Sequence, residues 1–277
     1  MPDIPATPDM PALPLRADIL LDACDHARAL DRSRYLPLTD LAQGESLQAG
    51  IAVARLARGE RPVGYKIGFT NRRLWPLYGV FHPIWGPVWD TTLTRVEGGE
   101  AEIAIDRFVE PRLEPEIVIG LRETPAAATP EAVLAATAWI AHGVEIVQCP
   151  FPGWRFSAAE AFAAQSLHGA LLIGAPRPLP KLKLGGDPAT VLARLAGVEL
   201  SLYCDGTLVE RGRGANALDG PMHAIAHLAH ELSLRGQSIA PGSLITTGTL
   251  TDAQPLRSGQ CWTTQLENID LPGLGLR

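Results

Sequence analysis

Basic side chains, charged side chains in general and long apolar runs are scarce in this sequence, and each shortage excludes a class of protein. The 277 residues contain 24 Lys and Arg against 30 Asp and Glu, a formal net charge of −6, whereas proteins that bind nucleic acid through its phosphates need a basic surface. Charged residues make up 19% and apolar residues 46%, which excludes disorder throughout the chain. No apolar run approaches the ~18 residues of a membrane span, and the first residues lack a signal-peptide pattern. We expect a folded cytoplasmic protein that binds neither nucleic acid nor membrane.

Cysteine is also sparse. The four cysteines, Cys24, Cys149, Cys204 and Cys261, are far apart in the sequence, so no CxxC metal or redox motif is present. A chain of this length can bury a core without disulfide or metal staples. We expect all four cysteines to be reduced and to pack as small apolar side chains.

Glycine and proline are by contrast abundant. The 27 glycines and 24 prolines make up 51 of the 277 residues, about 18% against a typical ~12%. Five of the prolines, at positions 2, 5, 8, 11 and 14, repeat every three residues, as in polyproline II. We predict that residues 1–15 form a flexible tail. The rest of the excess indicates many turns and short elements and disfavours a bundle of long helices.

Two kinds of pattern follow the predicted tail. Residues 16–60 form a helical segment in this interpretation, with amphipathic helices over 17–30 and 45–58. From residue 61 to 277, short apolar runs alternate with Gly, Pro and Asp, which is typical of a β-rich region. The runs that predict strands are 63–69, 103–105, 114–121, 144–147, 170–173, 198–203, 243–247 and 263–266. We therefore expect an α+β fold.

Turn and cap signals mark further boundaries in the β-rich region. Asp205-Gly206 lies between two apolar runs and predicts a β-hairpin. Thr129-Pro130-Glu131 is a typical helix start and predicts a helix over 130–142. Ser157 begins a second helix with a capping box, and a third helix is predicted over 221–236.

Three glutamates in the apolar runs are the most informative local feature. Glu114 and Glu116 are two residues apart in a predicted strand, so their side chains share a face and repel unless a cation or water separates them. Glu145 is the single acid of another apolar strand, where burial is costly without a partner. If the strands converge, the three carboxylates make an oxygen-rich site for Mg²⁺ or Mn²⁺. The alternative is a solvated face for the pair and an edge position for Glu145.

Lys66 is a further charge inside a strand-like run, between Gly64 and Gly68. A lysine near a metal site can serve in proton transfer. The alternative is an edge lysine whose stem covers apolar surface while its amine reaches water.

Six stretches, in order from about residue 64 to residue 249, resemble the fumarylacetoacetate hydrolase superfamily. Within it, the chain is most similar to the branch of 2-keto-4-pentenoate hydratases and 4-oxalocrotonate decarboxylases. The stretches are Gly64-Tyr65-Lys66-Ile67-Gly68-Phe69-Thr70, Glu114-Pro115-Glu116, Glu145-Ile146-Val147, Trp154, Gly214-Ala215-Asn216 and Ile245-Thr246-Thr247-Gly248-Thr249. The resemblance implies a β-rich mixed roll, here a catalytic domain over 61–277 preceded by the helical segment, assembled as a homo-oligomer.

The resemblance also implies roles for particular residues. It implies that Glu114, Glu116 and Glu145 ligate Mg²⁺ or Mn²⁺ and that Lys66 lies in the pocket. It further implies that a small 2-keto acid substrate is contacted by four residues, of which the last two hold its carboxylate: Tyr65, Trp154, Thr247 and Gly248.

The implied activity is that of a metal-dependent hydratase in the catabolism of aromatic or related compounds. It would add water to a 2-keto-4-enoate such as 2-hydroxypenta-2,4-dienoate. The cation polarises the keto group in this hypothesis, and Lys66 or Asp90 moves a proton. For Asp90, which follows a predicted strand, a turn role is the alternative.

The chain departs from the branch's pattern where polar pocket residues are expected. Those positions are Gly153, Ser157, Ala164 and Gln165. Two alternative functions therefore stay open. One is decarboxylation or C–C hydrolysis of a related acid, such as oxalocrotonate or an acylpyruvate. The other is keto-acid binding without turnover.

Overall fold

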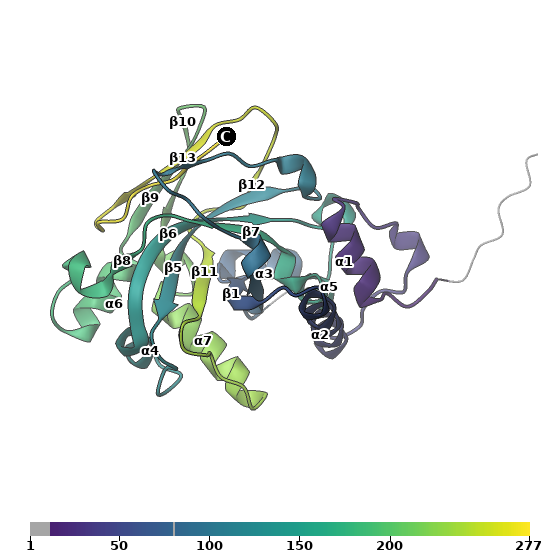
Figure 1. The fold of residues 1–277 in the computed structure, drawn as a ribbon, viewed down its shortest axis with the longest axis horizontal. Helices are drawn as coiled ribbons and strands as arrows, with labels where there is room; N and C mark the ends of the chain where they lie inside the picture. Colours follow the sequence, from purple (N-terminus) through teal and green to yellow (C-terminus); the bar gives the residue numbers. More distant parts are fainter. Residues whose placement is uncertain (1–11, 80) are drawn as a thin grey trace, which may run out of the picture.

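The strands fall into two curled sheets in the computed structural model, which describes residues 12–79 and 81–277. Their bounds are β1 Pro62–Gly68, β2 Ile84–Trp89, β3 Leu93–Arg95, β4 Glu100–Ala101, β5 Arg112–Leu121, β6 Thr137–Val147, β7 His168–Ile173, β8 Arg177–Pro178, β9 Glu199–Cys204, β10 Thr207–Arg213, β11 Leu244–Thr249, β12 Gln254–Pro255, β13 Trp262–Glu267 and β14 Gly275–Leu276. The larger sheet has the order β2-β1-β11-β5-β6-β7-β3, with β12 beside β5 and β8 beside β6. The smaller sheet has the order β10-β9-β13-β14-β4 and lies across one end of the larger sheet (Figure 1).

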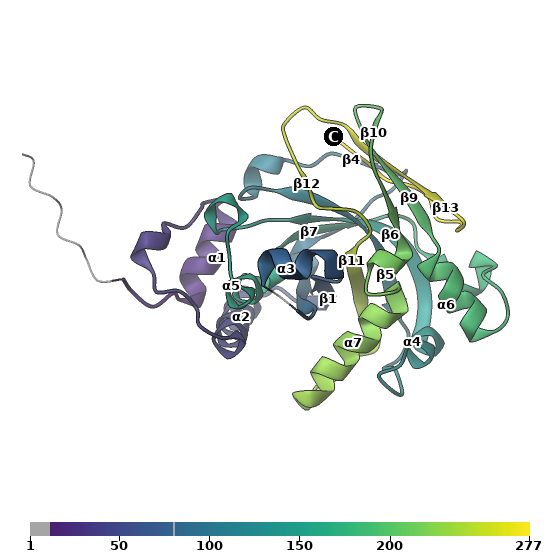
Figure 2. The same cartoon turned by 180° about the vertical axis from the view of Figure 1, so that it is seen from behind.

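Helices flank the larger sheet at both ends (Figures 1 and 2). Their bounds are α1 Ala17–Asp25, α2 Leu41–Ala57, α3 Trp75–Tyr78, α4 Pro130–Ala136, α5 Ala158–Ala163, α6 Pro188–Ala196 and α7 Pro221–Leu234. In both views α1, α2 and α5 group at one end, and α4, α6 and α7 group at the other. None of the helices in the described ranges has the length and apolar character needed to cross a bilayer. The α+β roll with N-terminal helices predicted from the sequence is confirmed.

The N-terminal helices share a core with later parts of the chain. Leu20 of α1 and Ile51 of α2 are buried in one apolar cluster with Phe151 and Phe162. Of the predicted tail, residues 1–11 lie outside the described residues, and Leu15 is buried. The division at residues 15 and 60 stays a prediction.

Local signals account for several boundaries. The Asp205-Gly206 hairpin is confirmed, with both residues at positive φ (50° and 75°) between β9 and β10, as the twist of a two-residue hairpin requires. The helix expected over 45–58 begins earlier, at Leu41, because Asp40 accepts a hydrogen bond from the Gln43 N–H at 2.9 Å and caps it.

Two other predictions of helices and strands were wrong. The helix expected over 17–30 ends at Asp25, where Ala27 takes a positive φ of 51° and the Arg28 N–H bonds back to Ala23 O. The strand expected over 103–105 is absent, because Ile105 begins a 3₁₀ turn.

The helix expected over 130–142 is the largest error. The helix α4 ends at Ala136, and Thr137 begins the eleven-residue strand β6. This strand pairs with β5 and β7, so sheet pairing overrides the local helix signal. His142, expected at a helix end, is buried within β6. Its Nδ1 lies 2.9 Å from Glu116 O and its Nε2 lies 2.8 Å from Thr264 Oγ1 of the smaller sheet.

Candidate metal centre and active site

The pairing of β5 with β6 brings the three glutamates together. In the antiparallel register Glu145 lies directly opposite Glu114, and Glu116 is two residues further along the same face. One oxygen from each carboxylate lies within 4.8 Å of the others. Glu116 and Glu145 are fully buried. The alternative of a solvated pair and an edge residue is therefore wrong.

The neighbouring groups orient these carboxylates and leave some of their oxygens free. Glu116 Oε2 accepts hydrogen bonds from the Thr246 hydroxyl and, at 2.7 Å, from the Gly248 N–H. Glu116 Oε1 has no hydrogen-bond partner among the described residues. Glu145 Oε1 lies 2.7 Å from His168 Nδ1, and its Oε2 lies 3.1 Å from Lys66 Nζ.

The pKa values express the cost of crowding three carboxylates in a buried site. Burial and the neighbouring negative charges raise the pKa of Glu116 well above its usual value. Burial also raises the pKa of Glu114 to about 7, against the opposing effect of Lys66. Burial would raise the pKa of Glu145 as well, but Lys66 and His168 outweigh it and the net direction is downward. Burial lowers the pKa of His168. Because an ionised carboxylate can only accept, His168 Nδ1 is the donor in the contact with Glu145.

These features fit a divalent cation. The donors are carboxylate oxygens, which Mg²⁺ and Mn²⁺ prefer. A buried oxygen without a hydrogen-bond partner, such as Glu116 Oε1, calls for a partner. Mutual repulsion of the three charges is relieved when a cation binds between them.

Lys66 reaches this cluster from β1. Its amine donates a hydrogen bond to Ser166 O at 2.9 Å as well as pairing with Glu145. Burial would lower the pKa of Lys66, but the surrounding glutamates outweigh it and raise that pKa. Ser166 lies in a turn in which three successive residues, 165–167, have φ between 53° and 66°. Such left-handed backbone is strained for residues other than glycine and concentrates at functional sites.

A narrow cavity of about 60 Å³ opens onto this cluster. Its polar lining comes from Lys66, Thr70, Asn71, Arg112, Glu114, Ser166 and Thr249, and its apolar lining includes Phe69, Val147, Trp154, Phe156 and Leu167. The hydroxyls of Thr70 and Ser166, each on a residue 2% exposed, have no hydrogen-bond partner in the described part of the chain. Buried hydroxyls in that state mark the places where a ligand would supply the partner.

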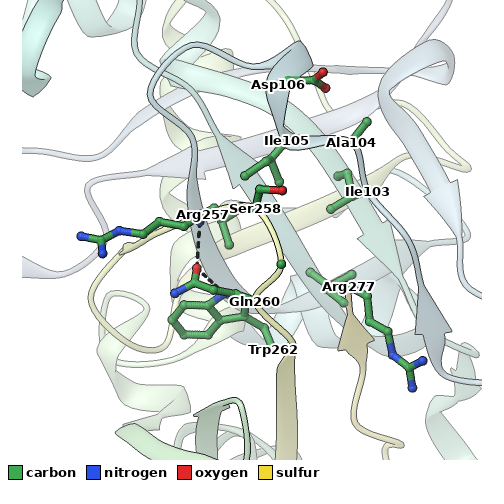
Figure 3. A pocket seen from close by; sticks show the side chains of 12 residues that line it. Ile103, Ala104, Ile105, Asp106, Arg257, Ser258, Gln260, Trp262 and Arg277 are labelled. Atoms are coloured by element: carbon green, nitrogen blue, oxygen red, sulfur yellow. Dashed lines mark hydrogen bonds between the residues drawn. The ribbon is translucent and has the colours of Figure 1, made fainter.

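Figure 3 shows another cavity, of about 350 Å³, between residues 103–106, residues 256–260 and the strands β13 and β14, and none of the predicted site residues lines it. The guanidinium groups of Arg257 and Arg277 extend to different sides there. No set of reactive groups converges on it, so volume alone does not identify the reaction site.

The structure brings together some of the predicted site residues and separates others. Lys66 and Trp154 line the narrow cavity together with Glu114 of the carboxylate cluster. Tyr65 lies on the opposite face of β1, against Trp85, because successive strand residues alternate. The side chain of Thr247 also points away from the carboxylate cluster, because it alternates with Thr246 along β11. Its hydroxyl donates to Ile117 O at 2.9 Å.

Gly248 contributes to the site through its backbone. Its φ is +105°, and a Cβ at this position would lie 1.9 Å from Thr70 Oγ1. Glycine is therefore required both for the conformation and for the space. The register of β11 against β5 shifts between Thr246 and Thr249, and the irregularity directs the Gly248 N–H at Glu116.

Asp90 does not join the cluster. It is exposed, and its Oδ1 accepts a hydrogen bond from the Arg61 N–H at 2.9 Å, while its own N–H donates to Arg61 O. These two hydrogen bonds place Asp90 in a turn, the role that was the alternative to proton transfer.

The four positions that depart from the hydratase pattern serve local structure. Ser157 caps α5 by a capping box with Glu160. Gln165 accepts a hydrogen bond from Trp89 Nε1 at 2.7 Å. Ala164 is buried and Gly153 takes a positive φ of 67°.

Several site residues were missed in the sequence. Thr246, His168, Thr70, Ser166 and Arg112 all contact the carboxylates or line the cavity. Two signals in the sequence could have indicated three of these residues. Thr70 and Thr246 lie inside the family-like stretches, and Arg112 precedes Glu114 and Glu116 at the same two-residue spacing, which puts it on the same face of the strand. Nothing in the sequence indicates His168 or Ser166, because strand pairing and the left-handed turn place them.

Known proteins resemble this chain over most of its length. The fumarylacetoacetate (FAA) hydrolase C-terminal family model matches residues 90–272. A 4-oxalocrotonate decarboxylase from Pseudomonas sp. is 31% identical over 228 residues, 82% of this chain and 83% of that protein. A 2-hydroxyhexa-2,4-dienoate hydratase from Comamonas testosteroni is 28% identical over 250 residues, 87% of this chain and 90% of that protein.

A solved structure shares the fold. The 4-oxalocrotonate decarboxylase from Pseudomonas putida G7, complexed with magnesium and adipate, has a TM-score of 0.82 and 23% identity, with 94% of this chain and 95% of that chain covered. The expected family is thus confirmed. With the buried carboxylates, Lys66 and the narrow cavity on one face of the larger sheet, this chain belongs to the fumarylacetoacetate hydrolase family, in its branch of 2-keto-4-pentenoate hydratases and 4-oxalocrotonate decarboxylases.

Proposed function

We propose that this chain is a divalent-metal-dependent hydro-lyase that adds water to a 2-keto-4-enoic acid in the catabolism of aromatic or related compounds. The observation that carries the proposal is the cluster of Glu114, Glu116 and Glu145 beside the buried amine of Lys66. Relatives named as hydratases, at 24–28% identity over most of the chain, support the reaction class.

The three glutamates would hold Mg²⁺ or Mn²⁺. When bound, such an ion supplies Lewis-acid polarisation of the substrate's keto group. The chain's own part is to fix the carboxylates before binding: Thr246 and the Gly248 N–H hold Glu116, and His168 holds Glu145. Partners of this kind reduce the reorganisation that binding requires.

Lys66 would transfer the proton. The 2-hydroxy-2,4-dienoate first becomes the 2-keto-3-enoate, as the enol oxygen loses its proton and C5 gains one; water then adds across C3=C4, which puts a hydroxyl group on C4 and a hydrogen on C3. The amine of Lys66 is protonated, because the glutamates hold its pKa above the usual range, and two of its three donors are engaged by Glu145 and Ser166. The remaining N–H is available to deliver a proton at C3.

Thr70 and Ser166 would hold the substrate's C1 carboxylate. Their hydroxyls line the cavity without partners, whereas the Thr247 hydroxyl is engaged by Ile117 O and the Gly248 N–H is engaged by Glu116. We therefore assign the carboxylate to Thr70 and Ser166 in place of Thr247 and Gly248.

A Thr70→Val substitution tests this assignment. Valine keeps the shape of threonine but removes the hydroxyl, so we expect KM to rise by about 10- to 100-fold, the loss of a hydrogen bond to a charged group. Thr247→Val is the matched control, and its KM is expected to stay unchanged. Steady-state kinetics measure both, and a rise in KM confined to Thr247→Val would restore the assignment made from the sequence.

The reaction itself is tested with purified protein and Mg²⁺. We expect the ultraviolet absorbance of 2-hydroxypenta-2,4-dienoate to fall with time, and the change to stop when EDTA removes the metal. Oxalocrotonate and an acylpyruvate are assayed in parallel. Carbon dioxide release from oxalocrotonate without dienoate hydration would favour the decarboxylase alternative, which the 31% identical relative supports. Metal binding without turnover of any of the three would favour a keto-acid-binding role.

We also propose a cytoplasmic homo-oligomer. The exposed apolar side chains of Val53 and Leu56 on α2, 67% and 53% exposed, support an interface between copies because they lie one turn apart on a helix surface. Light scattering on the purified protein measures the mass, and a monomer at micromolar concentration would contradict the oligomer.

A further inference from the structure

Thr92 supplies a hydroxyl behind the carboxylate cluster that the proposed function does not use. It ends the 3₁₀ turn Asp90–Thr92, which follows β2 directly. Its Oγ1 lies 2.8 Å from Nε2 of His168, the residue whose other ring nitrogen contacts Glu145. The hydroxyl and the imidazole are 76 positions apart in the sequence, so their contact depends on the folded chain.

The pairing of β3 with β7 brings Thr92 to His168. Thr92 immediately precedes β3, and His168 begins β7. The two strands are parallel, with Leu93 opposite Leu171. Because parallel strands begin at the same edge of a sheet, the residues at their starts are neighbours. The imidazole of His168 lies on a residue that is 3% exposed, so its ring nitrogens depend on the protein for partners.

Both ring nitrogens of His168 are engaged. Nδ1 lies 2.7 Å from Glu145 Oε1, and Nδ1 carries a hydrogen because an ionised carboxylate can only accept. Nε2 then either carries a second hydrogen or presents a lone pair. The hydroxyl of Thr92 suits both cases, since it can accept from an N–H or donate to a lone pair.

The backbone of Trp89 holds the Thr92 hydroxyl. The Trp89 N–H donates to Thr92 Oγ1 at 3.1 Å, and Trp89 O lies 3.0 Å from the same oxygen. The single hydrogen of the hydroxyl can therefore go to Trp89 O when Nε2 is a donor and to Nε2 when Nε2 is an acceptor. Trp89 is 1% exposed, so this row of contacts towards Glu145 starts from a residue fixed in the core.

We propose that Thr92 is a positioning residue of the metal centre, which acts through His168 to hold Glu145. With Oε1 of Glu145 engaged by His168, Oε2 is the oxygen left for a cation. The inference rests on one part of the proposed function, that the three glutamates hold a divalent ion. Outer-shell partners of this kind fix the orientation of a ligand before the metal binds. In Thr92→Val, Nε2 loses its partner and the imidazole is no longer held against Glu145.

Titration calorimetry with Mg²⁺ on the full-length protein tests this role. We expect Thr92→Val to raise the Kd for Mg²⁺ about 10-fold, at the lower end of the range for outer-shell partners. Thr92→Ser keeps the hydroxyl and is expected to keep the wild-type Kd. Thr91→Val is the matched control from the same turn. The hydroxyl of Thr91 donates to Glu60 at 2.6 Å, and its removal should leave the Kd unchanged.

Two further measurements separate positioning from a general loss of structure. The electron paramagnetic resonance spectrum of bound Mn²⁺ depends on the arrangement of its ligands, so we expect it to change in Thr92→Val and to keep its wild-type shape in Thr92→Ser. When His168→Leu is already present, Thr92→Val should cause no further loss of Mg²⁺ affinity, because residues that act in one network are not additive. Thermal unfolding of the metal-free variants verifies that each one folds.

The possible outcomes distinguish the positioning role from the proposed function. A wild-type Kd in Thr92→Val, equal losses in Thr92→Ser and Thr92→Val, or additive losses in the double variant would overturn the positioning role alone. Weaker Mg²⁺ binding in Thr92→Val, together with wild-type protein that leaves the dienoate unchanged, would support the positioning role and refute the proposed reaction. Wild-type protein that does not bind Mg²⁺ would overturn both.

Discussion

Replacement of Glu116 by glutamine is expected to abolish turnover and the thermal stabilisation by Mg²⁺. Loss of a charged ligand removes metal binding, and the polarisation of the keto group then lost is worth several kcal/mol, so activity should fall by about 10³-fold or more. For the wild-type protein, Mg²⁺ at 100 times its Kd should contribute about 2.7 kcal/mol to the free energy of unfolding. Turnover and melting temperature with and without Mg²⁺ are the measurements.

The same substitution should stabilise the metal-free protein. Burial and repulsion raise the pKa of Glu116 in the folded state, and a group with a raised folded-state pKa loses its stabilising contribution as pH rises through that pKa. Above the ordinary pKa of a glutamate, burial of Glu116 therefore costs stability in the metal-free protein, and neutral glutamine relieves that cost. The glutamine oxygen can still accept the bonds from Thr246 and Gly248. Each kcal/mol relieved should raise the melting temperature by about 2–4 °C.

A substitution that abolishes the stabilisation by Mg²⁺ and yet stabilises the metal-free protein distinguishes a metal ligand from a structural glutamate. Glu160 is the matched control, since it is buried and serves as a capping-box residue in α5. Glu160→Gln retains a side chain that fits the box and should keep the full Mg²⁺ shift. A Mg²⁺ shift of wild-type size in Glu116→Gln would refute the ligand assignment.

Replacement of Lys66 by methionine is expected to reduce turnover by about 10²- to 10⁴-fold, the usual contribution of a positioned proton donor. Metal binding should survive and grow tighter, because the amine no longer offsets the charge of Glu145 at 3.1 Å. The Mg²⁺-induced thermal shift should therefore increase while kcat falls. Kinetics and thermal unfolding on the same samples measure both.

Two further variants define what Lys66 does. Lys181→Met removes an exposed lysine in a 3₁₀ turn remote from the cluster and should leave both quantities unchanged. Lys66→Arg keeps a positive charge that stays protonated, so recovery of turnover in this variant would mean that Lys66 acts only as a counter-charge. Wild-type turnover in Lys66→Met would remove Lys66 from the reaction.

The parts of the site that could be predicted are those marked by a pattern of residues within one strand. The alternation of Glu114 and Glu116, with Glu145 as a lone acid in an apolar run, is a local pattern, and buried carboxylates in such runs need a common partner. Tyr65 and Thr247 were assigned from the family-like stretches without regard to which face they occupy. The alternation that groups the glutamates puts these two side chains on the far face of their strands.

Local patterns in the sequence are enough to predict the α+β class, the Asp205-Gly206 hairpin, the cap at Ser157 and the chemical type of the site. These depend on periodicity and on interactions within a few residues. Three features of the protein depend instead on the folded chain: residues 137–142 are strand, His168 orients Glu145, and Ser166 contacts Lys66 across 100 positions of sequence. Each of these depends on which strands pair and in what register, and a register is selected by burial of the whole sheet face.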